Sequence, residues 1–103
     1  MPTKDLYKKI TILTVTHNSA QVLTSFLDCI GSQFSLVIVD NDSKDETKLI
    51  LEKFQQKKKN LKIIFNKVGL GFGTAANIGL KLINTKFVLL INPDTKIQTN
   101  QIL

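Results

Sequence analysis

The sequence has a single cysteine and no long apolar run, and these two shortages narrow the class of protein. Cys29 cannot form an intramolecular disulfide, so nothing indicates an oxidising compartment. Its place in an apolar helical stripe predicts a small buried side chain and not a reactive thiol. No apolar run reaches the roughly 20 residues that span a bilayer, and the polar, basic segment 1–9 does not have the pattern of a secretory signal. The composition therefore favours a cytoplasmic protein.

Aromatic residues are also scarce where the positive charge gathers. The net charge is +6, and the densest block is Lys57-Lys58-Lys59. No aromatic side chain interleaves with these lysines, which argues against a nucleic-acid partner that stacks its bases. We interpret the block as the solvated end of a helix, where lysines suit the helix dipole. An anionic partner, or contact with anionic lipid at the inner face of the membrane, stays open.

Strand-like and helix-like segments alternate along the 103 residues, without repeats, low-complexity tracts or linkers. This alternation is typical of an α/β fold whose parallel strands are joined by crossover helices. Strands are expected at residues 9–16, 35–40, 61–65 and 87–91. The last run is apolar throughout, which predicts a strand buried on both faces.

Three amphipathic helices are expected between the strands. Asn18 or Ser19 should cap the first helix, which Gly31 ends, and Ser43 with Glu46 has the spacing of a capping box for the second. The third follows the glycine-rich turn 69–73. The side chains expected to face the core are Val22, Leu23, Phe26, Leu27 and Ile30; Thr47, Ile50, Leu51 and Phe54; and Ala76, Leu80 and Ile83.

The end of the sequence resembles the start of another helix, capped by Thr99 or Asn100. A domain does not normally stop one turn into an amphipathic helix. We therefore interpret residues 1–103 as a single partial domain from the front of a longer protein.

Polar residues follow three of the expected strands at the point where each ends. They are Thr16-His17-Asn18, then Asp40-Asn41-Asp42-Ser43, then Asn92-Pro93-Asp94. Ligands of open α/β sheets bind outside the carboxyl ends of the strands, so the three clusters should converge on one crevice. Carboxylate-rich sites suit Mg²⁺ or Mn²⁺. The pattern therefore predicts a phosphorylated ligand with a divalent cation.

Some of these residues also have plainer interpretations. His17 has no partner fixed by the sequence, so a hydrogen-bonded turn histidine is preferred to a base or a ligand. Asn and Asp favour turns, which could account for 40–42. Gly71-x-Gly73-x-x-Ala76 matches the dinucleotide fingerprint, although it starts several residues after the third strand. An NAD-binding oxidoreductase fragment and a non-catalytic basic module that binds anions both stay open.

Four blocks, in order and with matching spacing, resemble family 2 glycosyltransferases, most closely their rhamnosyltransferase-like branch. The blocks are Thr14 to Ser19, Ile38 to Asp45, Gly71-Phe72-Gly73 with Asn77-x-Gly79, and Asn92 to Thr95. The resemblance implies a GT-A fold, a three-layer α/β sandwich with an open, mainly parallel sheet, truncated here. It implies transfer of a sugar from a UDP- or dTDP-sugar to a glycan or lipid-linked acceptor, with Mg²⁺ or Mn²⁺.

The resemblance also assigns roles to individual residues. Asp94 would be the metal-binding carboxylate, and His17 stands where the family usually has tyrosine. No catalytic base is found, because the family's base and acceptor pocket come from a later segment, so this chain alone should be inactive. An incomplete sheet could also pair with a second copy. The residues expected to bind the nucleotide are Thr16, Asn18, Asp40, Asn41, Gly71, Phe72, Asn77 and Asn92.

Overall fold

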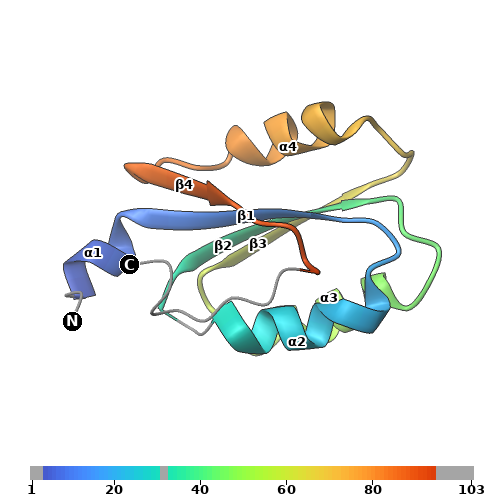
Figure 1. The fold of residues 1–103 in the computed structure, drawn as a ribbon, viewed down its shortest axis with the longest axis horizontal. Coiled ribbons are helices and arrows are strands. Elements are labelled where there is room, and N and C mark those ends of the chain that lie inside the picture. Colours follow the sequence, from blue (N-terminus) through green and yellow to red (C-terminus); the bar gives the residue numbers. More distant parts are fainter. Residues whose placement is uncertain (1–3, 31–32, 95–103) are drawn as a thin grey trace.

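A computed structural model describes residues 4–30 and 33–94 of the chain, and Figure 1 shows an open sheet between two helical layers. All four strands lie within one residue of their expected bounds. In chain order the elements are α1 (Lys4–Lys8), β1 (Ile10–Thr16), α2 (Ala20–Ile30), β2 (Ser35–Asn41), α3 (Thr47–Gln55), β3 (Leu61–Asn66), α4 (Phe72–Leu80) and β4 (Phe87–Leu90).

The sheet has the order β3-β2-β1-β4, and all neighbouring strands are parallel. The chain therefore builds outward from β1 to β3 and then crosses back to place β4 on the other side of β1. The strand order reverses between β1 and β4. Sheets of this kind bind their ligands at such a switch point, outside the carboxyl ends of the strands.

The two faces of the sheet carry separate cores, because successive side chains of a strand point to opposite faces. Helices α2 and α3 cover one face, below the sheet in Figure 1, around Ile12, Phe26 and Leu51. Helix α4 covers the other face, around Leu13 and Val39. Strand β1 is buried along its whole length, so both cores are built on it.

Gly79 brings helix α4 close to the sheet. A Cβ atom at this position would lie 2.5 Å from Leu13 Cδ1 and 2.9 Å from Val39 Cγ2, which is closer than real Cβ atoms pack. Only glycine therefore fits at this contact. The contact presses α4 onto β1 and β2, so that its first turn lies at the edge where the strands end.

Strand β4 is not buried on both faces as the sequence predicts. In the part of the chain that the structure describes, it is an edge strand that pairs with β1 alone, and the side chains of Phe87, Val88 and Leu90 are 51%, 39% and 48% exposed. Leu89 is half-buried and Ile91 is buried, and both pack in the core between the sheet and helices α2 and α3. Central strands and edge strands can both be apolar throughout, so the composition of residues 87–91 could not show which kind of strand they form.

The helices also differ from the expectation in places. Leu80 is 42% exposed because α4 ends there, and Ile83 follows in a loop, half-buried against the α4-side core. Val22 and Cys29 are half-buried. Gly31, which was expected to end the first helix, and the expected helix capped by Thr99 or Asn100 lie outside the described residues. No helix in 4–30 or 33–94 is long and apolar enough to cross a membrane.

Candidate functional site at the carboxyl ends of the strands

The polar clusters that follow β1 and β2 meet at Asp40. Its Oδ1 accepts hydrogen bonds from Thr16 Oγ1 at 2.7 Å and from Ser43 Oγ at 2.6 Å, and its Oδ2 accepts one from Ser43 N at 3.1 Å. All three residues are buried, and Asp40 is 0% exposed. A buried carboxylate needs such donors because it has lost its water. Asp40 therefore joins the end of β1 to the loop after β2, with both oxygens engaged inside the protein.

Ser43 does not form the expected capping box. Its hydroxyl is used by Asp40, and helix α3 starts later, at Thr47, with Glu46 at its N-cap and no side-chain cap on that residue. The Ser43 hydroxyl bonds to Asp40 and not to the helix start, because a buried carboxylate without donors is unfavourable.

Asp45 bonds to the starts of two helices, a role that the sequence analysis did not predict. Its Oδ1 accepts from Thr47 N at 2.9 Å and its Oδ2 from Ala20 N at 3.2 Å, so one carboxylate serves the first turns of both α3 and α2. Ser19 N also donates to Thr47 Oγ1 at 2.8 Å. Hydrogen bonding from Thr47, followed by the bond from Ala20, lowers the pKa of Asp45 in spite of partial desolvation. An aspartate two residues before a helix start was the available signal.

The turn after β1 is fastened to the loop after β2. His17 Nδ1 lies 2.8 Å from the backbone oxygen of Asn41, and because a carbonyl can only accept, Nδ1 carries the hydrogen. The other ring nitrogen, Nε2, lies 3.5 Å from Asn18 Nδ2 on the exposed side of the ring. Asn18 has a left-handed φ of 49°, its N–H donates to Ser43 Oγ at 2.9 Å, and its Oδ1 accepts from Lys44 N at 2.7 Å. The expectation of a hydrogen-bonded turn histidine is confirmed.

Asn41 connects this junction to the glycine-rich turn. Its Nδ2 donates to the backbone oxygen of Leu70 at 2.6 Å, and its Oδ1 accepts from Leu70 N at 2.9 Å and from Asn66 Nδ2 at 3.3 Å. The side-chain amide thus pairs with one residue's backbone through both a donor and an acceptor. Asn41 is 8% exposed. The turn before α4 is therefore held at the carboxyl end of β2.

The described residues give no steric reason for glycine at the three glycine positions of that turn. A Cβ built at Gly69, Gly71 or Gly73 meets nothing within 4 Å, and none of the three has a left-handed φ. They are exposed, as are Phe72 and Asn77 on α4. Gly71 is the N-cap of α4 and makes no side-chain cap bond, so the helix start offers N–H groups to the surface. Bare backbone of this kind admits the close approach of an anion.

The third cluster lies at the end of β4. Leu90 pairs with Leu13, whereas β1 continues to Thr16, so β4 ends short of its neighbour and the chain leaves the sheet there. Asn92 and Asp94 are exposed. Among the described residues, no hydrogen bond or ion pair joins Asp94 to the first two clusters. The structure thus brings Thr16, Asn18, Asp40 and Asn41 together with the glycine turn, and places Asp94 at the neighbouring strand end.

Within the described parts of the chain, no three His, Cys, Asp or Glu side chains are grouped so as to hold a metal ion. Mg²⁺ sites in enzymes of phosphorylated substrates often use one or two carboxylates and complete the shell with phosphates and water. The exposed carboxylate of Asp94 and the amide oxygen of Asn92 fit that kind of site, but not a site built from protein ligands alone.

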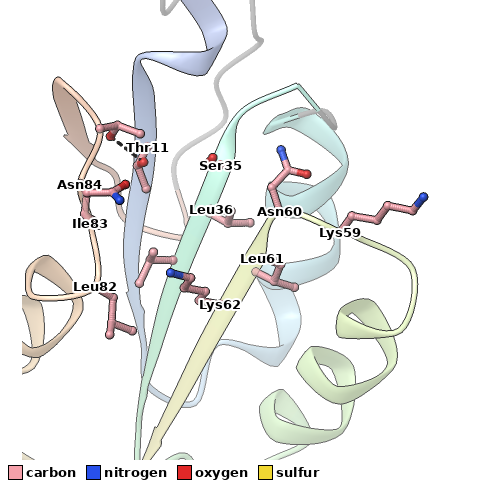
Figure 2. Close-up of a pocket in the computed structure, with 12 residues that line it drawn as sticks. Thr11, Ser35, Leu36, Lys59, Asn60, Leu61, Lys62, Leu82, Ile83 and Asn84 are labelled. Carbon is pink, nitrogen blue, oxygen red and sulfur yellow. Dashed lines mark hydrogen bonds between the residues drawn. The ribbon is translucent and has the colours of Figure 1, made fainter.

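A pocket of about 150 Å³ lies elsewhere, at the opposite edge of the sheet (Figure 2). Thr11, Ser35 and Leu61, from the first residues of three strands, line it together with the loop that follows α4. In that loop Thr85 Oγ1 lies 2.7 Å from Thr11 Oγ1. Because ligands of parallel sheets bind at the carboxyl ends, this pocket is not the candidate site.

An open parallel sheet, a glycine-rich helix start and polar strand ends at the switch point are together typical of α/β proteins that bind nucleotides. Residues 11–103 match the family model described as glycosyl transferase family 2, and the chain belongs to this family. This match includes the glycine turn, so an NAD-dependent oxidoreductase is not favoured. The rhamnosyltransferase-like branch remains a prediction.

Two curated relatives and two solved structures show the nature of the similarity. The poly(ribitol-phosphate) beta-N-acetylglucosaminyltransferase TarS of Staphylococcus aureus is 32% identical over 93 residues, which are 84% of this chain and 16% of TarS. A teichoic acid poly(glycerol phosphate) polymerase of Staphylococcus epidermidis is 28% identical over 94 residues, or 86% of this chain and 13% of the polymerase.

The crystal structure of TarS residues 1–349 in complex with UDP-GlcNAc superposes with a TM-score of 0.81 at 30% identity, over 91% of this chain and 29% of that one. The mannosyltransferase PcManGT from Pyrobaculum calidifontis, in complex with GDP-Man and Mn²⁺, has a TM-score of 0.77 at 20% identity, over 91% and 30% of the two chains. The latter supports the fold alone. The GT-A fold expected from the sequence is confirmed, and the chain spans less than a third of each of these proteins.

Proposed function

We propose that this chain is the donor-binding part of a glycosyltransferase that takes its sugar from a nucleoside diphosphate, with a UDP- or dTDP-sugar as the donor. The observation that carries the proposal is the fastened junction at the carboxyl ends of β1 and β2, where Asp40 and Asn41 hold the two loops and the glycine turn beside the switch point. Family membership and the UDP-GlcNAc in the TarS structure support the same choice of ligand.

The proposed roles divide between residues that shape the site and residues that face it. Thr16, Asp40 and Asn18 hold the loops in place through buried or backbone bonds. The His17 ring, with its exposed Nε2, can meet the nucleobase, where the family usually presents tyrosine. The first turn of α4 offers N–H groups to a phosphate. The exposed residues proposed to line the donor are Gly71, Phe72, Asn77 and Asn92.

Asp94, with Asn92 beside it, would hold Mg²⁺ or Mn²⁺ together with the phosphates of the donor. When bound, such a cation neutralises charge on the departing diphosphate. Asp94 is exposed, so it can reach a cation without rearrangement of the core.

For the acceptor we propose a polyol-phosphate polymer, carried as a glycan or on a lipid. TarS is named for poly(ribitol-phosphate), and the polymerase relative for poly(glycerol phosphate). A chain with a net charge of +6 suits an anionic acceptor. A cytoplasmic site at the inner face of the membrane would bring such an enzyme to a lipid-linked acceptor.

The donor proposal is tested by the thermal stability of the chain with UDP, with and without Mn²⁺. Ligand at about 100 times its dissociation constant adds about 2.7 kcal/mol of stability. For a domain of this size the melting temperature should rise by an amount on the order of ten degrees. Asp94→Asn should lose the Mn²⁺-dependent part and keep the melting temperature of the unliganded protein.

The control variant is Glu52→Gln, which removes an exposed carboxylate from α3, away from the strand ends. It should respond like wild type. An equal response of wild type and Asp94→Asn would place the metal elsewhere, and no UDP response in any variant would refute donor binding by this chain.

Asn41 offers a second test, because holding the glycine turn and directly contacting the pyrimidine base of the donor predict different results. If Asn41 mainly holds the glycine turn through Leu70, Asn41→Ala should weaken uridine, thymidine, guanosine and adenosine diphosphates alike. Loss of a hydrogen-bonded pair of this kind corresponds to about tenfold in affinity. If Asn41 reads the base directly, only the preference for pyrimidines should disappear. Calorimetric titration with the four nucleotides in Mn²⁺ separates the two roles.

A further inference from the structure

A second, positively charged pocket lies where helices α2 and α3 end. It is an open pocket of about 480 Å³, lined by Leu27, Asp28, Phe54, Lys57, Lys58, Lys59 and Asn60. Asn60 directly precedes β3, so the pocket is at the edge where the strands begin. It is therefore separate from the candidate donor site, which lies where the strands end.

Lys58 differs from its two neighbours in this pocket. Lys57 and Lys59 are exposed, as expected for the solvated end of a helix. The Nζ atom of Lys58 is instead buried, and it has no hydrogen-bond partner among the residues that the structure describes. Burial lowers the pKa of Lys58. A shielded ammonium without a partner is unfavourable, and an anion that enters the pocket would relieve this.

The other polar groups of the pocket leave room for an anion. Asp28 is the carboxylate among the lining residues, and no ion pair joins it to the lysines in the described part of the chain. Asn60 Nδ2 donates to the backbone oxygen of Phe34 at 3.3 Å, which orients the amide. Leu27 and Phe54 supply an apolar wall along which lysine stems can lie.

We propose that this pocket binds a phosphate group, as a phosphomonoester or phosphodiester, with Lys58 as its central ligand. Three lysines and one aspartate line the pocket. This excess of positive charge favours a compact anion with several acceptor oxygens, and lysine is a common phosphate ligand. The site needs neither the divalent cation nor the donor nucleotide. It stands independently of the donor proposal and gives the chain a second point of attachment for a phosphate-bearing partner.

The test uses the chain without divalent metal and titrates inorganic phosphate, then glycerophosphoglycerol as a soluble phosphodiester, by nuclear magnetic resonance. Lys58→Met keeps the length of the side chain and removes its charge. Lys53→Met, on the exposed surface of helix α3, which precedes Lys58 in the chain, is the matched control. We expect binding to weaken at least about tenfold in Lys58→Met and to stay at the wild-type level in Lys53→Met.

Three further measurements separate this pocket from the donor site and from an effect on stability. Lys58→Met should melt no lower than wild type without phosphate, since it removes a buried and unpaired charge, and Asp94→Asn should bind phosphate normally. Sedimentation with phosphatidylglycerol and phosphatidylcholine vesicles shows whether lipid headgroups also supply the phosphodiester. Absence of phosphate binding in wild type, equal weakening by both lysine variants, or loss of binding in Asp94→Asn would each overturn the assignment.

Discussion

Helix α4 lies so close to the sheet at Gly79 that alanine should destabilise the protein there. The added Cβ would lie 2.5 Å from Leu13 Cδ1 and 2.9 Å from Val39 Cγ2. Leu13 is 1% exposed and Val39 0% exposed, so neither side chain can turn toward solvent. Val39 is also β-branched and therefore stiff about χ1. The helix or the strands must shift to admit the methyl group.

The size of the effect follows from two opposing contributions. Overpacking a filled core costs about 1–3 kcal/mol. Alanine regains about 1 kcal/mol because glycine is the poorer helix former. We expect a net loss of about 1 kcal/mol, which lowers the melting temperature of a domain of this size by about 4–8 °C.

Gly73 provides the matched control, since it lies in the same helix and a Cβ there meets nothing within 4 Å. Gly73→Ala should therefore show only the gain in helix propensity, about 0.5–1 kcal/mol, and melt higher than wild type. Thermal and urea unfolding followed by circular dichroism would measure both variants. If Gly79→Ala is as stable as Gly73→Ala, the close contact at Gly79 does not destabilise a larger side chain, and the prediction is wrong.

Two further predictions concern other parts of the fold. Asp45→Ala removes the acceptor shared by the starts of α2 and α3 and should cost about 1–2 kcal/mol in urea unfolding at neutral pH. The folded-state pKa of Asp45 is lowered, so the loss of stability should be complete above the unfolded-state pKa of about 4. It should shrink as the pH falls through the folded-state pKa. A loss of stability that does not depend on pH would contradict this prediction. The apolar edge strand β4 predicts self-association, which Val88→Lys should reduce in sedimentation velocity runs without lowering the melting temperature. A wild-type chain that stays monomeric at high concentration would contradict this.

The order of the four strands and of the three helices between them could be predicted from the sequence because it depends on local patterns, whereas the short helix α1 was not predicted. Runs such as Leu36 to Val39 are apolar enough to form buried strands wherever the sheet places them. The burial of each strand is a different matter, because it depends on neighbours that come from distant parts of the chain. Phe87 to Leu90 has the composition of a central strand and lies at the edge.

The candidate site shows the same limit at the level of single hydrogen bonds. That Thr16 and Asp40 would lie near each other follows from parallel strands ending at one edge of the sheet. The spacing of residues could not predict two of the hydrogen bonds. The Ser43 hydroxyl bonds to Asp40 and does not cap a helix, and Asn41 pairs with the backbone of Leu70. Both bonds depend on burial and on loop paths that local pattern does not contain.

The short pairing of β4 with β1 also bears on how the chain opens. Four residue pairs hold β4, between segments far apart in the sequence, whereas β1 and β2 share six pairs in the middle of the sheet. Few contacts and high sequence separation are the marks of a unit that unfolds locally before the rest. Backbone amides of β4 should therefore exchange with deuterium well before those of β1 and β2. Since Asn92 and Asp94 follow β4 directly, a nucleotide that binds there with its cation would slow exchange in this strand first.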